Sequence, residues 1–392
     1  MLPNIMIIGN IVSMTIFDRQ LRLDLLLKKK NLFLFGPLAT GKTFLLKQQL
    51  PDAAYYDLLD ADAFGRLSRR PKIIGEERES KGQLIIIDEI QKLPQVLDEV
   101  HRLIESRGLR FLLTGSSARK LKRGGANLLA GRAWEALLFP LCFPEIPNFL
   151  LLQYLNRGGL PSIYPSPHYE EDLHSYTNLY LREEIFAEAL ARRIDAFARF
   201  LDVVALTNGE ELNFQGLASD CGVPARTLQN YLQVLEDTLI GFKLPAFLQT
   251  RQRKAISRAK FYLFDVGVTN SLARRGEIKT KSELFGKCFE HFLILEIRAY
   301  LNYQRRFLPL SYWRSTSGFE VDCIVGRRLA LEFKSTDLVS ERHLRGLKAF
   351  KEEGLIEKFA IVSMDEEPRR IGGIQIYPWR EFLMSLWEGR II

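Results

Sequence analysis

Cysteine is scarce in this sequence, with four residues in 392, and no two of them have the C-x-x-C spacing of a zinc or redox site. Scattered single cysteines argue against a zinc site and against a disulfide framework, and they fit a reducing compartment such as the cytoplasm. Membrane-length apolar runs, repeats and low-complexity tracts are also missing. The sequence therefore predicts a cytoplasmic protein with no membrane partner.

The N-terminus reads MLPNIMIIGNIVSMTIF, which is apolar but short. It lacks the basic start and the small-residue cleavage site of a signal peptide. Residues 1–14 are therefore a candidate extension upstream of the first domain. The rest of the chain is long enough for two or three domains. Its net charge of +8 favours polyanionic partners, nucleic acid first, although a merely basic surface gives the same balance.

Residues 36–43 read GPLATGKT and fit G-x-x-x-x-G-K-[ST]. An apolar run at 32–35 precedes them and a helical pattern follows, which is the strand–loop–helix context that a phosphate-binding loop needs. Lys42 would reach the β- and γ-phosphates of ATP, and the Thr43 hydroxyl would ligate Mg²⁺. The residues expected to line the nucleotide are Gly36, Pro37, Leu38, Ala39, Thr40, Gly41, Lys42 and Thr43.

The first part of the chain alternates apolar strand patterns with helical ones, which predicts an α/β sheet with parallel strands. The predicted strands are 31–35, 55–59, 83–88, 109–114 and 134–139. The third strand ends in Asp88 and Glu89, at the sheet edge where the phosphate loop lies. Asp88 would hold Mg²⁺ through water, and Glu89 would orient and polarise the attacking water.

Two further residues near strand ends are candidates for the nucleotide site. Thr114 ends the fourth strand, where its hydroxyl would lie between Glu89 and the γ-phosphate; a simple turn cap is the alternative. Arg132 precedes the fifth strand and would stabilise the transferring phosphoryl group in a neighbouring subunit; an ordinary surface arginine is the alternative.

The stretches GPLATGKT, IIIDEIQKLP (85–94), FLLTGSS (111–117) and LAGRAWEALLFPL (129–141) together resemble a family of bacterial and archaeal AAA-type ATPases. The C-terminal half of these proteins is usually recorded as a domain of unknown function. One departure is Leu38-Ala39, where such proteins more often carry Arg-Gln. The resemblance implies an AAA-like sheet at 15–145, a small helical lid at 146–192, and assembly into rings.

Residues 193–275 have the pattern of a winged helix. A helix near 193–207 is followed by FQGLASDCG, a tight turn at 223–225 and a second helix, which is the helix–turn–helix spacing of DNA-reading proteins. A basic run, RQRKAISRAK (251–260), would then grip phosphates on a hairpin wing; a protein contact or a solvated loop is the alternative. The residues expected to contact nucleic acid are Arg226, Thr227, Asn230, Arg251, Arg253, Lys254, Arg258 and Lys260.

Residues 276–392 return to a mixed α/β pattern. The order of helix, three strands, helix and strand, with an Asp followed ten residues later by Glu-x-Lys, resembles the restriction-endonuclease-like fold. The resemblance implies Mg²⁺ at Asp322 and Glu332, with Lys334 and the helix residue Glu290 completing a catalytic site. A decayed or purely DNA-binding version of this site, or plain solvated charge on a sheet face, remains an alternative.

The sequence as a whole predicts a multidomain α/β protein: an AAA-like ATPase, a helical lid, a winged helix and a restriction-endonuclease-like domain. We expect it to hydrolyse ATP with Mg²⁺, to bind structured DNA and to remodel or cleave it, and to form homo-oligomers, a hexameric ring among them. Two other functions stay open. One is a slow nucleotide switch in signalling or defence, and the other is a binding scaffold with an inactive nuclease fold.

Overall fold

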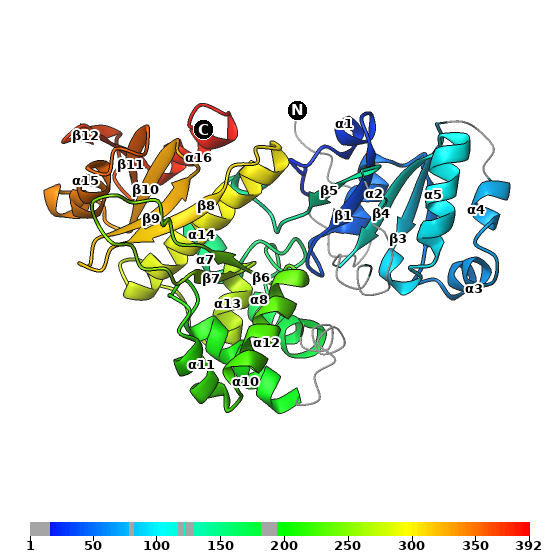
Figure 1. Cartoon of the computed structure of the whole chain (residues 1–392), viewed down its shortest axis with the longest axis horizontal. Coiled ribbons are helices and arrows are strands. Elements are labelled where there is room, and N and C mark those ends of the chain that lie inside the picture. The colour runs from blue at the N-terminus through cyan, green and yellow to red at the C-terminus, as the bar shows by residue number, and fades with distance from the viewer. Residues whose placement is uncertain (1–15, 78–81, 117–120, 122–128, 130, 182–193) are drawn as a thin grey trace.

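The computed structural model describes residues 16–77, 82–116, 121, 129, 131–181 and 194–392, so the candidate extension at 1–14 lies outside the described residues. Two β-sheets lie at opposite ends of the long axis, and a group of helices lies below the region between them (Figure 1). Over these ranges, no helix combines the length and the apolar character that a membrane crossing requires.

The N-terminal sheet has five strands in the order β2-β3-β4-β1-β5, and every neighbouring pair is parallel. All five predicted strands are confirmed, with ends that differ by at most two residues. The strands are β1 (Asn31–Phe35), β2 (Ala54–Asp57), β3 (Leu84–Asp88), β4 (Arg110–Gly115) and β5 (Ala133–Leu137). The helices are α1 (Leu23–Leu27), α2 (Lys42–Gln49), α3 (Ala61–Arg69), α4 (Ile73–Glu76) and α5 (Val96–Arg107), with a 3₁₀ turn at Ile90–Lys92.

The middle of the chain is helical. Its elements are a 3₁₀ turn at Phe143–Glu145, α7 (Leu151–Arg157), α8 (Tyr169–Ser175), a π-helical turn at Tyr176–Leu181, α10 (Ile194–Leu206), α11 (Phe214–Cys221), α12 (Ala225–Asp237) and α13 (Val266–Leu272). One hydrophobic core contains Leu160 and Tyr176 together with residues of α10, α11, α12 and α13. The helices on both sides of residues 182–193, which lie outside the described part, therefore pack as one unit.

The two helices predicted on either side of the turn at 223–225 are present as α11 and α12, and the second ends at Asp237, three residues before the predicted end at 240. Gly222 ends α11 with a left-handed backbone (φ 63°), a conformation that suits glycine because it has no Cβ, and Pro224 precedes the first turn of α12. The inward face of α12 is apolar and buried, with Leu228, Tyr231 and Leu235 in the core. The opposite face is therefore left to solvent.

The predicted hairpin wing is wrong in its position. Strands β6 (Gly241–Leu244) and β7 (Lys260–Leu263) do pair antiparallel. The residues between them, however, leave the helices and run along β8 (Leu310–Arg314) of the C-terminal sheet. The amide of Phe247 donates to the carbonyl of Tyr312 at 2.7 Å, and the amide of Ile256 donates to that of Arg314 at 2.8 Å. Backbone hydrogen bonds thus hold the segment to the other domain.

The C-terminal sheet has six strands in the order β12-β13-β11-β10-β9-β8. Its parallel part is β10, β11 and β13, and antiparallel strands flank it. The strands are β8 (Leu310–Arg314), β9 (Glu320–Val325), β10 (Leu329–Lys334), β11 (Lys358–Ser363), β12 (Arg369–Ile371) and β13 (Ile374–Pro378). The helices are α14 (Glu283–Tyr303), α15 (Arg345–Lys351) and α16 (Trp379–Trp387), with a 3₁₀ turn at Glu341–Leu344.

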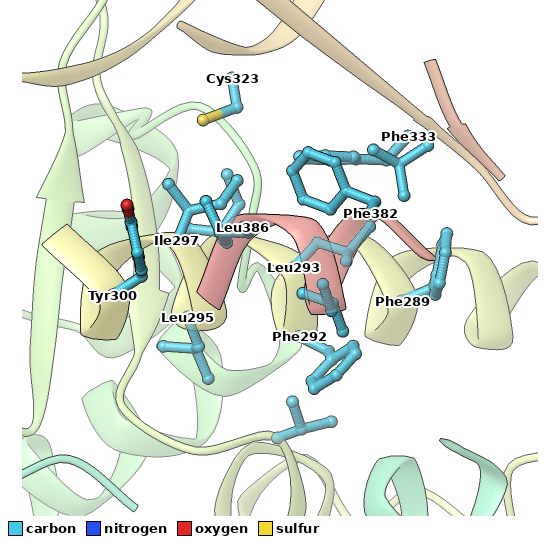
Figure 2. Close-up of a cluster of buried hydrophobic side chains, with 14 of the residues drawn as sticks. Phe289, Phe292, Leu293, Leu295, Ile297, Tyr300, Cys323, Phe333, Phe382 and Leu386 are labelled. Atoms are coloured by element: carbon cyan, nitrogen blue, oxygen red, sulfur yellow. The ribbon is translucent and has the colours of Figure 1, made fainter. Parts of the chain in front are cut away.

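Helix α14 forms the centre of the C-terminal core. Ser282 caps its first turn, accepting a hydrogen bond from the Phe285 amide at 3.0 Å. Apolar side chains follow on nearly every face, as expected of a helix covered on all sides. Figure 2 shows these side chains against Phe382 and Leu386 of α16 and against the sheet.

The last turn of α14 also packs onto the N-terminal sheet. The Tyr303 hydroxyl accepts a hydrogen bond from the Phe139 amide at 3.0 Å, and the Asn302 side chain accepts one from the Leu137 amide at 3.4 Å. Ala299 and Tyr303 belong to the hydrophobic cluster that covers one face of β1. One helix therefore contributes to the cores of both sheets.

His291 of α14 is a buried neutral histidine. Its Nε2 lies 2.7 Å from the Leu263 carbonyl and therefore carries the hydrogen, which leaves Nδ1 to accept from Asn208 at 3.3 Å. Burial lowers the pKa of His291 to about 4. The unfolded chain, with a histidine pKa near 6.5, binds more protons between these two values, so stability falls as the pH falls through that window.

We expect the free energy of unfolding to drop by about 2 kcal/mol between pH 7 and pH 5 on account of His291 alone. In the variant His291→Gln, the amide can make both hydrogen bonds without titrating, so this part of the pH dependence should vanish. Chemical denaturation of both proteins at the two pH values measures the difference. Equal pH dependence of the two proteins would contradict the assignment.

Candidate functional site

The phosphate loop lies between β1 and α2, and glycine is required at two of its positions. Gly41, the residue before α2, has a left-handed backbone (φ 89°). A Cβ on Gly36 would lie 2.6 Å from the carbonyl oxygen of Leu138, so no side chain fits there. The loop backbone can therefore fold tightly and turn its amides toward one point, which makes an anion site.

Polar side chains close this loop on itself. The Lys42 ammonium donates to the carbonyls of Gly36 and Pro37 at 2.8 and 3.1 Å, and the Thr40 hydroxyl donates to Pro37 at 2.8 Å. Leu38 and Ala39 form the tip, and Ala39 adopts a positive φ of 63°. Lys42 is thus held above the bend of the loop, where phosphate oxygens could replace the carbonyls as its acceptors.

Asp88 is the centre of the polar group beside the loop. It ends β3 and is buried, and its Oδ2 accepts from the Thr43 hydroxyl at 2.9 Å. The Tyr55 hydroxyl donates to the same oxygen, and the Thr114 hydroxyl donates to Oδ1. The sequence-predicted residues Thr43, Asp88 and Thr114 therefore meet at one point, because β1, β3 and β4 end at the same sheet edge.

Glu89 follows Asp88 in an unusual backbone conformation. Its φ is 59°, a left-handed value that is uncommon for a residue with a side chain. The Glu89 amide donates to the Thr114 hydroxyl at 3.1 Å, and its carboxylate accepts from the Gln91 amide group. The side chain is only partly buried. Glu89 is thus held at the sheet edge beside Asp88, where backbone strain of this kind often accompanies a functional position.

The buried Arg19 ties the phosphate loop to its surroundings. Its guanidinium donates to the Thr40 carbonyl at 2.8 Å and to the Phe139 carbonyl at 2.5 Å, and its Nε lies 3.0 Å from Oε2 of Glu145. The Glu145 carboxylate also accepts from the backbone amides of Gln20 and Cys142. The two charges are thereby paired, and hydrogen bonds satisfy the carboxylate and the terminal guanidinium nitrogens, whereas Nε of Arg19 is buried without a hydrogen-bond partner. Pairing of this kind lowers the cost of burying the two ions.

The middle helices also reach the loop. The Tyr176 hydroxyl donates to the Leu38 carbonyl at 3.1 Å, and Leu38 packs against the helical core. A movement of the loop tip would therefore change the position of the π-helical turn that carries Tyr176, or break this hydrogen bond.

Arg132 lies away from the phosphate loop of its own chain. It precedes β5, whose first residue pairs with Asn31 at the start of β1, so it lies at the sheet edge opposite Gly36. Its guanidinium pairs with Glu105 near the end of α5. Arg132 thus takes no part in the nucleotide site of its own chain.

A second polar group, the carboxylate–lysine cluster, is formed by Glu290, Glu320, Asp322, Glu332, Lys260 and Lys334. Lys334 pairs with Glu332 at 2.6 Å, and the Phe333 amide donates to Asp322 at 2.7 Å. Lys260 lies 3.1 Å from Glu290 and 2.8 Å from Glu320. The four residues expected from the endonuclease resemblance therefore do lie in one cluster, together with a lysine from β7.

Burial and mutual repulsion perturb the titration of these groups. Burial raises the pKa of Asp322 to about 6, and the charge of Glu290 adds to the shift. Burial, then the charge of Asp322, raises the pKa of Glu332 well above its ordinary value. Burial opposes ionisation of Glu290 as well, but Lys260 and a 2.6 Å hydrogen bond from Tyr262 outweigh it and lower its pKa. The cluster thus has more carboxylates than its two lysines neutralise.

The fit of this cluster to a metal ion can be judged from its oxygens. Oε2 of Glu332 is buried and has no hydrogen-bond partner, which leaves a carboxylate oxygen that a cation would satisfy. Among the described residues, no three His, Cys, Asp or Glu side chains are grouped so that they could hold an ion by themselves. An ion at Asp322 and Glu332 would need further oxygens from water or phosphate, as Mg²⁺ usually does.

The predicted nucleic-acid residues fall into two groups. Arg226 and Asn230 are exposed and Thr227 is half-buried, all on the outer face of the first turns of α12. In the basic segment, Arg251, Lys254 and Arg258 are also exposed. These positions are available to a partner.

Two residues of the basic segment are not available, and their assignment to a phosphate-gripping wing is wrong. Lys260 is buried within the carboxylate–lysine cluster. Arg253 pairs with Glu352, donates to the Ala349 carbonyl and lies over the Phe319 ring. The backbone amides at 251–253 all donate to the buried carboxylate of Glu353. Arg253 and Lys260 thus use their positive charge to bind carboxylates of the C-terminal part of the chain.

Three residues around the phosphate loop are not predicted as site residues from the sequence. Tyr55 was one more residue of a predicted strand, and Arg19 stood in no motif. Gln91 lay within the DEIQKLP stretch, yet only the structure shows its contact with Glu89. Their roles depend on pairings that the order of residues does not reveal.

Three family matches cover most of the chain. Residues 28–147 match a family described as AAA domain, residues 148–279 match a domain of unknown function, DUF8612, and residues 285–382 match another, DUF4143. A segment similar to the AAA domain is therefore followed by two segments similar to families that have no assigned function.

Relatives among curated proteins are uncharacterized. A protein of Methanocaldococcus jannaschii is 24% identical, over 72% of this chain and 69% of its own length. A second protein from that organism is 21% identical, over 92% of this chain and 85% of its own length. A Haemophilus influenzae protein is 24% identical, over 58% of this chain and 60% of its own length.

Two solved structures show weak similarity. One is a signal transduction ATPase with numerous domains (STAND) and a tetratricopeptide repeat sensor from Pyrococcus horikoshii. It has 15% identity and a TM-score of 0.25, over 75% of this chain and 48% of that one. The other is a DNA polymerase III gamma subunit-related protein from Thermotoga maritima, with 11% identity and a TM-score of 0.24, over 55% and 97%. At such TM-scores, neither structure supports an inference about this chain.

The variant Arg19→Met should destabilise the protein by about 3–5 kcal/mol, because it leaves Glu145 buried without its counter-ion. The double variant Arg19→Met/Glu145→Gln should recover part of this loss, since the buried charge is gone. Chemical denaturation of the wild type, both single variants and the double variant measures the coupling. Strictly additive effects would contradict a direct ion pair.

Proposed function

We propose that this protein hydrolyses ATP with Mg²⁺ at the loop Gly36–Thr43. The observation that carries the proposal is the meeting of Thr43, Asp88 and Thr114 beside Lys42. The AAA domain match over residues 28–147 supports the same reading. A hydroxyl, a carboxylate and an ammonium group around an amide-lined loop form the set that phosphoryl transfer requires.

Each residue has a distinct part in this mechanism. Lys42 exchanges the carbonyls of Gly36 and Pro37 for phosphate oxygens. The Thr43 hydroxyl would ligate the metal and the Asp88 carboxylate would hold it through water, and the bound metal would supply positive charge against the phosphates. Glu89 orients the attacking water, and Thr114 keeps Asp88 and the Glu89 backbone in register by bonding to both.

The variant Lys42→Ala should lose nucleotide binding, whereas Glu89→Gln should keep it and lose at least about 100-fold in kcat. The difference arises because Lys42 contacts the bound phosphates and Glu89 acts on water. Phosphate release measures turnover, and equilibrium binding of a fluorescent ATP analogue measures affinity.

Asp98→Asn is the matched control for Glu89→Gln, because Asp98 is an exposed carboxylate on α5 in the same domain. It should leave both quantities unchanged. If the wild-type protein does not turn over ATP, or if Glu89→Gln turns it over at the wild-type rate, the proposal fails.

We also propose that the protein assembles into a homo-oligomer, of which a hexameric ring is one form. Arg132 lies at the sheet edge opposite its own phosphate loop and is partly exposed, so in an assembly it would approach the nucleotide of an adjacent copy. Its pairing with Glu105 would then be exchanged for a phosphate contact, as in arginine fingers supplied in trans.

DNA is the partner proposed for the middle and C-terminal parts. The exposed start of α12 carries Arg226, Thr227 and Asn230, which suits phosphate and base-edge contacts. Arg251, Lys254 and Arg258 remain exposed on the segment that joins this helix pair to the C-terminal sheet. Binding through such residues should be salt-sensitive.

A second candidate function, Mg²⁺-dependent cleavage of DNA, is favoured by the unpartnered Oε2 of Glu332. Asp322 and Glu332 would hold the metal with oxygens of the DNA phosphate and water, and the bound metal would supply Lewis acidity. Lys334 would stabilise charge on the phosphate. Glu290 and Lys260 would position each other, since they form a largely buried ion pair.

The variants Asp322→Asn and Glu332→Gln should each reduce cleavage of single-stranded, duplex or branched DNA by at least about 100-fold, while ATP turnover stays unchanged. Electrophoresis of labelled DNA in Mg²⁺ or Mn²⁺ measures cleavage. Glu366→Gln, an exposed carboxylate in the same domain, is the control. Wild-type protein that cleaves none of these substrates, or variants that cleave normally, would instead support an inactive nuclease fold.

A further inference from the structure

The C-terminal sheet has a groove at the end opposite the carboxylate–lysine cluster. The groove has a volume of about 650 Å³ and lies where β10 and β11 begin, between the loop after α15 and the chain after α16. Its walls include Phe359 of β11 and Tyr377 of β13, both half-buried. It thus presents aromatic surface within a polar opening.

Cations from four elements surround this groove. Lys351 ends α15, Lys358 begins β11, Arg370 lies on β12 and Arg390 follows α16. All four side chains are exposed. Among the described residues that line the groove, Glu357 is the one acidic side chain. The opening therefore carries a net positive charge.

The turn between β9 and β10 adds two more arginines to the same edge. The carbonyls of Arg327 and Arg328 accept from the amides of Glu357 and Lys358 at 3.1 and 3.0 Å, so the turn lies directly beside the start of β11. Both arginines are exposed. The positive region thus extends beyond the groove along the end of the sheet.

Most of this charge is not neutralised within the chain. Arg390 pairs with Glu388, but within the described ranges no ion pair or side-chain hydrogen bond is found for the head groups of Lys351, Lys358 and Arg370. Other cations of the domain behave differently: Arg369 pairs with Asp365, and Lys348 with Glu341. Neighbouring unpaired cations repel one another, and an anion bound between them would relieve that repulsion.

We infer that this groove binds the phosphate backbone of a nucleic acid strand. Exposed ammonium and guanidinium groups spread over several elements suit a polyanion that contacts them together and releases counterions, and half-buried aromatic rings suit contact with bases. Leu329 at the groove and Glu332 of the cluster are three residues apart on β10, about 10 Å along the strand. The inference rests on the proposed DNA partner and assigns its main contact to this sheet edge.

The test compares the wild type with the triple variant Lys351→Gln/Lys358→Gln/Arg370→Gln. Binding of fluorescein-labelled single-stranded and duplex DNA is followed by anisotropy over a series of KCl concentrations, with EDTA present to prevent cleavage. The slope of log K against log salt is negative, and three lost phosphate contacts should reduce its magnitude by about 2 for a single strand and about 3 for a duplex.

The matched control is Lys28→Gln/Lys29→Gln/Lys72→Gln, which removes the same charge from exposed positions of the N-terminal domain. This variant should keep the wild-type slope. Equal losses in both triple variants, or none in the groove variant, would overturn the inference while leaving the DNA partner in place. Wild-type protein that binds no oligonucleotide would overturn both.

Two measurements keep the result interpretable. The thermal unfolding curve of the groove variant should match that of the wild type, because the changed residues are exposed, and this shows that the variant is folded. Inorganic pyrophosphate serves as a competitor. If pyrophosphate displaces DNA no better than KCl of the same ionic strength, the result supports a polyanion site. Displacement by stoichiometric pyrophosphate indicates a small-anion pocket and overturns the inference.

Discussion

The buried ion pair of Arg19 and Glu145 holds the phosphate loop in place against the chain after β5 and the middle helices. One guanidinium contacts the carbonyl of Thr40 in the phosphate loop, the carbonyl of Phe139 after β5, and the Glu145 carboxylate at the start of the middle helices. Because both ions are shielded from water, any shift that separates them leaves an uncompensated charge. The position of the loop is therefore fixed by residues outside its own strand and helix.

Helix α14 extends this constraint to the far side of the molecule. Tyr303 at its end contacts Arg19 and the backbone of Phe139, whereas Glu290 near its start contacts Lys260 in the carboxylate–lysine cluster. Glu290 and Tyr303 are thirteen positions apart, which is about 20 Å of continuous helix. Apolar side chains pack it along this length, so both ends move together (Figure 2). The two polar sites are thus attached to one rigid element.

The sequence predicted the elements whose signals are local. An apolar run, a glycine loop and Lys42-Thr43 are contiguous, and the five strands follow from apolar patterning, so the N-terminal sheet and its convergence on Asp88 were predictable. The fate of the basic segment was not, because Lys260 and Arg253 look like solvent-exposed cations until Glu290, Glu320 and Glu352 are brought beside them. Arg19 and Tyr55 were missed for the same reason: their partners are remote in the chain.

The route of residues 245–256 along β8 has a consequence for self-association. An outer strand with free amides and carbonyls invites pairing with a strand of another molecule. Here the backbone of Phe247 and Ile256 occupies such groups on β8. The other outer strand, β12, is three residues long and carries Arg369 and Arg370. Both margins of this sheet are thus poor templates for strand addition, and copies of the chain that meet at the C-terminal domain would do so through side-chain surfaces instead of a sheet extended across them.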